Sequence, residues 1–281
     1  MSSSLSYLTL LFNDAAGSQS SLLDAIYGIG GSSTGSTNPV QALQSAELNQ
    51  TQDVKVTAAQ STVQSAIAGF TKAVNSATSM TQLLANPAFM NVLLTANGMS
   101  DQIGYTALAT KALTSDQSKS TSLVNQLADT RWLTLAKAYN FSSTGLSSFQ
   151  TPAAIASMAS LYTTNIWETS QDSVTPGLSN ALAFKAQAST ITSVDQILGN
   201  PTMRTVVTTA LGIPAQIAFQ DLTAQETAIS TRVDITKFKD PKFVETFVQQ
   251  YLIANAAAAS SSSSSTPDLT TLAVQGQGIL V

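Results

Sequence analysis

The stretch SMTQLLANPAFMNVLLTANGMSDQI at residues 79–103 occurs a second time, as SVDQILGNPTMRTVVTTALGIPAQI at residues 193–217. The second copy follows the first at a constant offset of 114 residues, without a gap. In each copy Ser and Gln stand at the spacing of a capping box, and an Asn-Pro pair precedes an apolar run that ends at Gly. Asn favours the N-cap, Pro is tolerated in the first helical turn, and Gly accepts a left-handed conformation after a helix. Each copy therefore predicts a short helix and then a second helix between Asn-Pro and Gly.

The similarity between the copies extends beyond this stretch. The copies rejoin at an offset of 111 residues, and each ends in a segment rich in aromatic residues. Apolar residues recur at helical spacing through most of the chain, and Thr151-Pro152 predicts the start of a further helix between the copies. The sequence predicts an all-α fold with a duplicated helical domain at residues 54–254, whose two units span about 56–141 and 178–254. The aromatic residues that we assign to its core are Trp132, Tyr139, Phe141, Phe243, Phe247 and Tyr251.

Both ends of the chain differ from this body in composition. Residues 1–53 predict a flexible, partly disordered N-terminal arm, because their Gly/Ser/Thr run buries too little apolar surface to offset the entropy of ordering. Residues 255–281 predict a Ser-rich linker and an apolar C-terminal tail. No cleaved signal peptide and no membrane span are expected, since no basic segment precedes the first apolar run and no run reaches ~20 residues. The apolar side chains predicted to contact partners are Leu8, Leu11, Phe12, Leu272, Val274, Ile279 and Leu280.

Charge and residue usage exclude several classes of function. Charged residues make up only 10% of the chain, whose net charge is −4, whereas binding to nucleic acid requires clustered Lys and Arg. The chain contains no Cys and no His, which excludes disulfides, Cys or His zinc sites, Cys nucleophiles and His general bases. We expect no nucleic-acid partner, no metal and no cofactor. The basic residues that we interpret as a solvated face are Arg232, Lys237, Lys239 and Lys242.

Carboxylates and hydroxyls remain as catalytic candidates. Glu168 and Asp172 are four residues apart, as an acid pair on one helix face requires, but we interpret them as solvated acids at a helix end. Asp129 and Arg131 near Trp132 could form a small polar site, but we interpret them as a helix cap beside a snorkelling arginine. A Gly-x-Ser-x-Gly match around Ser33 lies in the Gly/Ser run, and no His is present to activate the serine. The sequence therefore predicts a non-enzymatic protein with no catalytic residue and no small-molecule substrate.

The strings LLANPAF, LLTANGMSDQI and LADTRWLTLAKAYNF in residues 79–141, and SVDQILGNP and FKDPKFVETFVQQYL in residues 178–254, carry a family resemblance. The chain resembles an uncharacterised alphaproteobacterial family encoded in flagellar gene clusters. Its composition also resembles that of flagellar axial proteins exported through the flagellar type III apparatus. The resemblance implies a mostly helical protein tied to flagellar assembly or structure, and it implies no catalytic residue.

These observations lead to two functional hypotheses. The first is a structural or interaction protein of the bacterial flagellum, exported without a cleaved signal, which contacts other flagellar proteins or copies of itself. The alternative is a cytoplasmic flagellar chaperone or assembly regulator that binds an export substrate through the apolar stripe at residues 56–74. An enzyme that uses carboxylates would require Glu168 and Asp172 to converge in a concave pocket.

Overall fold

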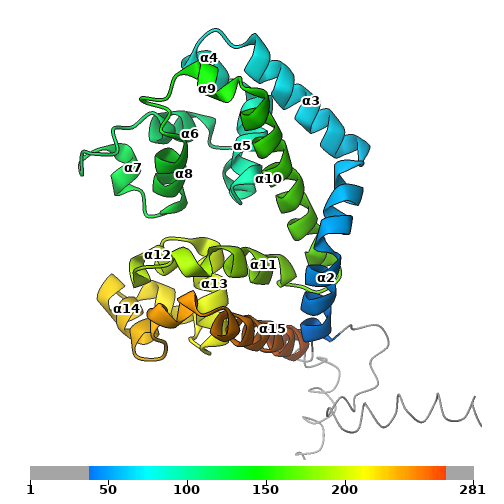
Figure 1. Cartoon of the computed structure of the whole chain (residues 1–281). Helices are drawn as coiled ribbons and strands as arrows, with labels where there is room; N and C mark the ends of the chain where they lie inside the picture. Colours follow the sequence, from blue (N-terminus) through cyan, green and yellow to red (C-terminus); the bar gives the residue numbers. More distant parts are fainter. Residues whose placement is uncertain (1–37, 264–281) are drawn as a thin grey trace, which may run out of the picture. The chain divides into compact units, whose positions relative to one another are not determined.

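The computed structural model describes residues 38–263, with side chains to residue 259, and every regular element in this part is helical. The predicted all-α fold is confirmed (Figure 1). The α-helices are α2 (Pro39–Ala58), α3 (Ser61–Ser76), α4 (Met80–Leu84), α5 (Pro87–Ala96), α6 (Thr106–Leu113), α7 (Leu123–Gln126), α8 (Arg131–Tyr139), α9 (Leu146–Phe149), α10 (Pro152–Ser170), α11 (Leu178–Gln187), α12 (Val194–Leu198), α13 (Pro201–Ala210), α14 (Leu222–Ser230) and α15 (Pro241–Ser263). The 3-10 helices are η1 (Ser100–Gln102), η2 (Gln171–Ser173), η3 (Ala188–Thr190), η4 (Ala215–Phe219) and η5 (Ile235–Lys239).

The repeated stretch forms the helices that its capping signals predict. The Asn86 side chain accepts hydrogen bonds from Ala88 N at 2.9 Å and Phe89 N at 3.3 Å at the start of α5. Asn200 accepts the same two bonds, at 3.0 and 3.3 Å, at the start of α13. The glycines that follow these helices have φ of 68° and 61°, a left-handed conformation that favours glycine.

The described helices pack around two hydrophobic cores. The first core contains buried side chains of α3 to α8 and the first half of α10, with Phe89 and Trp132 among the largest. The second contains side chains of α2 and α11 to α15, together with Trp167 from the second half of α10. Each of the two predicted units, about 56–141 and 178–254, therefore contributes most of one core, and α10 contributes to both.

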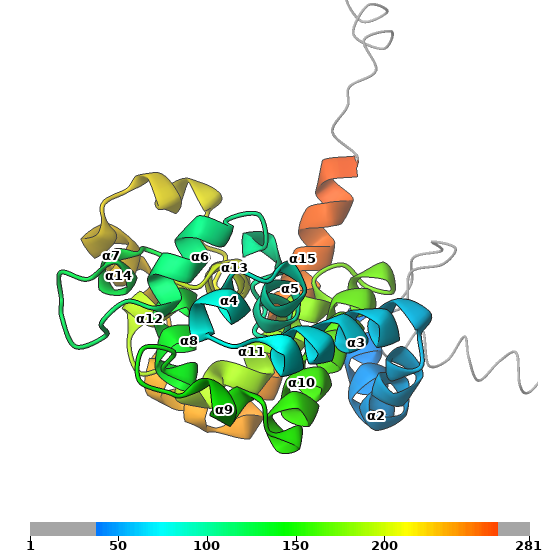
Figure 2. The ribbon, with the colours of Figure 1, turned by 90° about the horizontal axis from the view of Figure 1, so that it is seen from above.

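Two helices outside the repeated stretch connect these cores. Helix α10 packs on α5 of the first core and on α2 and α11 of the second. Helix α2 packs against α10, α11 and α15, and the chain then enters α3 through a short turn at Ala59 and Gln60 (Figures 1 and 2). The predicted helix after Thr151-Pro152 is confirmed as α10, and Thr151 caps it by accepting a bond from Ala154 N.

The predicted boundary of the N-terminal arm at residue 53 is wrong, because residues 39–53 belong to α2. Asn38 and Pro39 repeat the Asn-Pro capping signal, and Asn38 accepts a hydrogen bond from Val40 N at 2.9 Å. Leu43 is fully buried in the second core. Lys185 of α11 also forms ion pairs with Glu47 of α2 and with Glu245 of α15, which fasten α2 to this core.

The predicted start of the C-terminal linker at residue 255 is also wrong. Helix α15 continues to Ser263. Alanine has the highest helix propensity of any residue type, so the four alanines at residues 256–259 favour this extension. The seven predicted partner contacts, Leu8, Leu11, Phe12, Leu272, Val274, Ile279 and Leu280, lie outside the described residues. Among the helices of residues 38–263, none is long and apolar enough to cross a membrane.

The apolar stripe at residues 56–74, proposed above as a binding surface for an export substrate, faces the first core. Val63 and Phe70 are buried there, and the Phe70 ring stacks on Phe89 with centroids 5.7 Å apart. Val56, the first residue of the stripe, is exposed. The stripe is therefore a packing face of α3 and offers no free apolar surface over most of its length.

Candidate functional site

A cavity of about 410 Å³, with a lining of both polar and apolar side chains, lies between helices of the two cores. Three helices each present one face to it, and the end of α5, the start of α13 and Gln50 of α2 complete the lining. The side chains on the three faces are Arg131, Thr134, Leu135 and Ala138 of α8, Leu161, Thr164, Asn165 and Glu168 of α10, and Ala183, Ala186 and Gln187 of α11. These positions recur every three or four residues, so each set occupies one face of its helix.

Arg131 is held in the wall of this cavity by two carboxylates and a carbonyl oxygen. Its Nε donates to Asp129 Oδ1 at 3.0 Å, and its two terminal nitrogens donate to Asp101 at 2.9 and 2.8 Å. The same nitrogens reach Gly98 O at 2.9 Å and Asp129 Oδ2 at 2.7 Å. The interpretation of Arg131 as a snorkelling arginine is wrong, because only 9% of its side chain is exposed and its guanidinium is paired inside the protein. The paired carboxylates stabilise this buried charge.

The Arg131 network also changes the proton affinity of its members. Burial raises the pKa of Asp101, but the hydrogen bonds from Arg131 and Gln102 outweigh burial and hold this pKa below its usual value. Burial lowers the pKa of Arg131, and its bonds to Asp129 and Asp101 again outweigh burial and raise the pKa. Asp129 precedes Thr130, the N-cap residue of α8, and its Oδ1 accepts a hydrogen bond from Arg131 N at 3.0 Å, so its side chain pairs the first N–H group of the helix from one residue before the N-cap.

Glu168 is the second charged group of the cavity. Its side chain is half-buried, and burial raises the pKa of its carboxyl group to about 7. Within residues 38–263, its carboxylate has no hydrogen-bond or ion-pair partner. The interpretation of Glu168 as a solvated acid is therefore wrong, because its position at the end of the Leu161, Thr164 and Asn165 face turns it into the cavity.

Asp172 does not join Glu168 in this site. It is absent from the cavity lining, and its two oxygens accept hydrogen bonds from Ser179 N at 2.9 Å and Ser179 Oγ at 2.5 Å. These bonds tie η2 to the first turn of α11. The convergence of Glu168 and Asp172 that a two-carboxylate enzyme requires is not found.

The two cores meet beside the cavity at Gly199. Thr130 N donates a hydrogen bond to Gly199 O at 2.9 Å, which joins the segment before α8 to the segment before α13. A Cβ atom on Gly199 would lie 2.3 Å from Thr130 Cγ2 and 2.9 Å from Ala128 O. Gly199 has φ of −78°, so glycine is needed here for the close approach of the two segments rather than for backbone conformation.

A second candidate surface is an exposed aromatic position that occurs in both copies. Tyr105 and Phe219 align at the offset of 114 residues, and 59% and 89% of their surfaces are exposed. Tyr105 is the N-cap residue of α6, and Phe219 ends η4 shortly before α14. Leu222, also exposed, is the first residue of α14. The alignment of the two copies shows an aromatic residue at this position in both, but it does not show that both rings are exposed.

The aromatic residues assigned to the core behave as predicted. Trp132, Phe141, Phe247 and Tyr251 are buried, while Tyr139 and Phe243 pack against the cores from partly buried positions. Phe247 stacks on Phe184 with ring centroids 5.7 Å apart. These rings are therefore packing residues.

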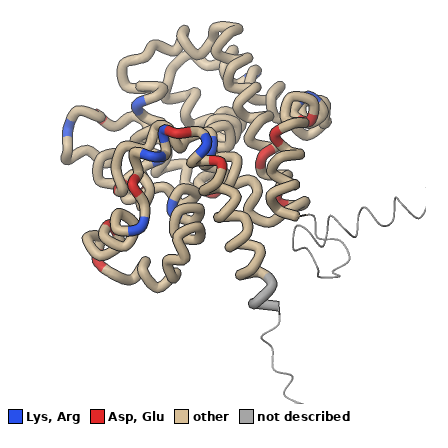
Figure 3. The backbone as a smooth tube through the Cα atoms, turned by 60° about the horizontal axis from the view of Figure 1, so that its bottom comes forward, with Lys and Arg blue, Asp and Glu red and all other residues tan. Residues whose placement is uncertain are grey.

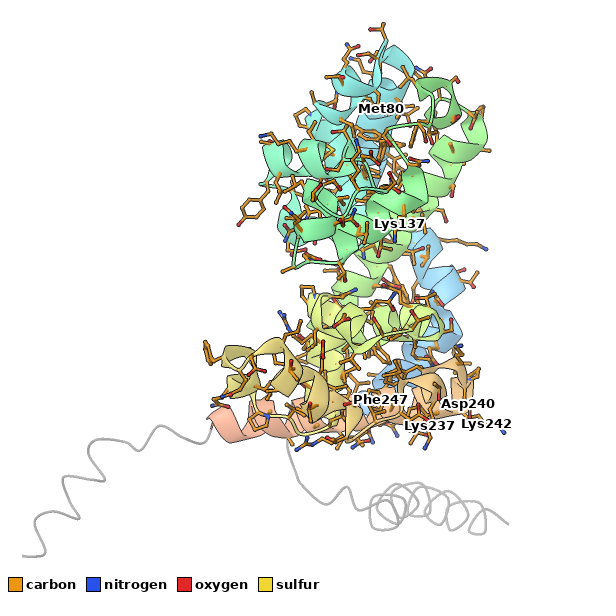
Figure 4. The ribbon with its side chains drawn as sticks, turned by 90° about the vertical axis from the view of Figure 1, so that its left-hand side faces the viewer. Met80, Lys137, Lys237, Asp240, Lys242 and Phe247 are labelled. Carbon is orange, nitrogen blue, oxygen red and sulfur yellow. The ribbon has the colours of Figure 1, made fainter. Side chains whose placement is uncertain are left out.

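The basic residues near the start of α15 lie on a solvated face. Lys237, Lys242 and Asp240 lie close together at this end of the second core (Figure 4), and all three are exposed. Lys237 Nζ lies 5.8 Å from the centroid of the Phe243 ring, so its charge rests over an aromatic face. Over the described chain, charged residues are sparse and both signs occur side by side (Figure 3). Within residues 38–263, no group of three or more carboxylates is placed to hold a metal ion.

Comparison with known proteins gives a family and a fold. The sequence profile of the family described as "Protein of unknown function (DUF1217)" matches residues 96–244, more than half of the chain. No curated protein matches. A crystal structure of a protein from Agrobacterium tumefaciens is similar, with 22% sequence identity and a TM-score of 0.65. The match covers 80% of this chain and 96% of that protein, and at this identity it shows a shared fold alone.

Proposed function

We propose that this chain, which belongs to the DUF1217 family of proteins of unknown function, is a non-enzymatic structural or interaction protein of the bacterial flagellum. The observation that carries the proposal is the exposed aromatic position that the duplicated body presents twice, at Tyr105 and Phe219. The resemblance to proteins encoded in flagellar gene clusters supports the choice of organelle.

Tyr105 and Phe219 are suited to docking because each is a large ring on a helix-bounded segment. An aromatic side chain buries roughly 150–250 Å² when a partner covers it, and such residues supply much of the binding energy of protein interfaces. A short 3-10 helix precedes Tyr105 and another ends at Phe219, and an α-helix follows each, so the backbone that carries each ring is held in helical segments. Less backbone entropy is therefore lost when a partner binds than for a ring on an irregular loop.

Two equivalent contacts on one chain suit a partner that is itself built from repeated subunits. Once the first contact forms, the second forms at a high effective concentration, so the pair binds more tightly than either contact alone. An axial flagellar structure provides such repeated subunits. We propose that the partner is an assembled flagellar protein, and that the chain reaches it by the flagellar type III route.

The test is recovery of the protein with purified flagella, measured by quantitative mass spectrometry. Tyr105→Ser and Phe219→Ser should each lower the recovered amount, and the double variant should lower it by about tenfold or more. Leu48→Ser is the matched control, because Leu48 is 86% exposed on α2 and lies outside both copies of the aromatic position. Circular dichroism should show unchanged helix content, since all three side chains are exposed.

Two results would contradict the proposal. Full recovery of the double variant with flagella would exclude the aromatic position as the contact. Absence of the wild-type protein from flagella, with a single export substrate bound to it in the cytoplasm, would instead support the chaperone or assembly-regulator alternative.

A further inference from the structure

We propose that the cavity between α8, α10 and α11 binds a small organic monocation, an aliphatic amine that also carries a hydroxyl or amide group, with Glu168 as its counterion. This ligand is bound and not chemically changed, so the proposal is independent of the proposed function at Tyr105 and Phe219. We call this cavity the Glu168 cavity.

The sign of the ligand's charge follows from how the two charged groups of the Glu168 cavity are paired. Every N–H group of the Arg131 guanidinium is directed at Asp129, Asp101 or Gly98 O, so Arg131 has no donor left for an anion. Glu168 is the one lining carboxylate, and it has no partner among the described residues. A cation would therefore supply the missing ion pair, whereas an anion would face the Glu168 carboxylate and find no free charged donor.

The neutral part of the lining indicates the rest of the ligand. Asn165 and Thr164 stand one turn before Glu168 on α10, and Gln187 and Gln50 face the same cavity from α11 and α2. Within the described chain, none of these four side chains is hydrogen-bonded to another side chain. Amides and hydroxyls of this kind bind hydroxyl or amide groups of a ligand.

Size and apolar contacts complete the description of the ligand. Leu135 and Leu161 line the Glu168 cavity from α8 and α10, and they offer contact to a short aliphatic chain. A volume of about 410 Å³ is in the range of small-molecule sites. Because the lining comes from both cores, a bound ligand would also hold the two cores together and stabilise the folded chain.

The titration of Glu168 sets the expected pH dependence. Burial raises the pKa of Glu168 to about 7, so below this pH the free cavity holds a neutral carboxyl group and the amine must displace its proton. An aliphatic amine stays protonated to about pH 10, so affinity should rise between pH 6 and pH 8. Arg131 is the other charged group of the lining. The charged residues on elements packed against α10 that do not line the cavity are Glu47, Asp53, Lys55, Lys72, Asp172 and Lys185.

The test uses three compounds of equal length that differ in charge, with the whole chain at pH 8. They are 5-aminopentan-1-ol as the cation, pentane-1,5-diol as the neutral compound and 5-hydroxypentanoate as the anion. Ligand-observed NMR should detect binding of the cation alone, in the millimolar range expected for a compound of seven heavy atoms. Glu168→Gln should weaken this binding by about tenfold or more.

Asp53→Asn is the control, because it removes one carboxylate from α2 without changing the cavity lining. Its affinity for 5-aminopentan-1-ol should equal that of the wild type. Glu168→Gln removes a half-buried charge that has no partner in residues 38–263, so it should fold at least as well as the wild type, as thermal unfolding can check. Three results would overturn the proposal: no binding of the cation, equal binding of the diol, or unchanged binding in Glu168→Gln. None of them bears on recovery of the protein with flagella.

Discussion

The two copies of the repeat share their helices and caps but differ in the polar groups that surround the cavity. Arg131 of the first copy aligns with Lys242 of the second, and Asp101 aligns with Ala215. Asp129 and Asp240 also align, and each accepts a hydrogen bond from the backbone N–H two residues later, at 3.0 and 2.9 Å. The cap is therefore common to both copies, whereas the buried arginine network exists only in the first.

This difference separates the scaffold from the site. Apart from the exposed pair Tyr105 and Phe219, most matched positions are capping residues and buried apolar residues, which any stable copy of this unit requires. Three of the positions that differ lie at or beside the contact between the two cores: Arg131 and Asp101 in one copy, and Gly199 in the other. The cavity is therefore asymmetric: the first copy supplies the buried arginine to its wall, and the second copy has no equivalent of this network.

The largest expected effect is in the cores, at the aligned pair Phe89 and Met203. Phe89→Ala should lower the free energy of unfolding by about 3–5 kcal/mol, because Phe89 is fully buried and stacks on Phe70. Met203→Ala should have a smaller effect, since Met203 lacks this ring contact. Urea denaturation measures both. Val92→Ala and Val206→Ala, the same change at matched buried positions, should destabilise equally, and unequal values would show that the two cores are not equivalent.

The buried arginine gives the next effect. Arg131→Met should destabilise the protein by about 3 kcal/mol, because it leaves Asp129 and Asp101 without their shared cation. The aligned change Lys242→Met should be within about 0.5 kcal/mol of the wild type, as expected for an exposed side chain. Similar losses for the two variants in thermal unfolding would refute the claim that only the first copy carries a structural arginine.

Contact between the cores gives the third effect. Gly199→Ala should destabilise by about 2 kcal/mol, because the added methyl group meets Thr130 and the carbonyl oxygen of Ala128. Ala85 occupies the aligned position, where Ala85→Gly should lower stability by at most about 1 kcal/mol through backbone entropy. The denaturant midpoints of both variants measure these losses of stability. An unchanged midpoint for Gly199→Ala would mean that the two segments can separate freely.

The smallest expected effect concerns the feature that the copies share most closely. Asn86→Ala and Asn200→Ala should each destabilise by about 1 kcal/mol, because each removes the acceptor for the first N–H groups of α5 or α13. Replacement by Ser should restore most of the loss at both positions. A cap that proved dispensable in only one copy would indicate that tertiary packing alone determines where that helix begins.

Most of the scaffold could be predicted because its signals are local. The Ser, Asn-Pro and Gly signals act within one turn of the chain, and they placed α4, α5, α12 and α13 correctly. Asn38-Pro39 carries the same capping signal, but it follows the Gly/Ser run directly, so the sequence pattern places residues 39–53 of α2 in the arm. The narrow apolar stripe of α2, in which Ala42 and Ala46 flank Leu43, gave only a weak helical period.

The candidate sites could not be predicted in the same way, because they depend on which faces meet. Glu168 was visible as an acid at helical spacing from Asn165 and Leu161, but its pKa depends on burial by other helices. The exposure of Tyr105 and Phe219 likewise depends on what covers them, whereas the nearby aligned apolar pair Met99 and Ile213 is buried.

The sequence by itself determined the all-α fold, the two similar units and the start of their repeated helices, since capping and amphipathic periodicity are properties of neighbouring residues. Only the tertiary structure decided that α2 completes the second core and that α10 contributes to both. It also decided that Arg131 is paired while Glu168 has no partner among the described residues. The physical reason is that burial and charge pairing depend on residues far apart in the chain, such as Arg131 and Asp101. Local sequence patterns do not predict which distant residues come into contact.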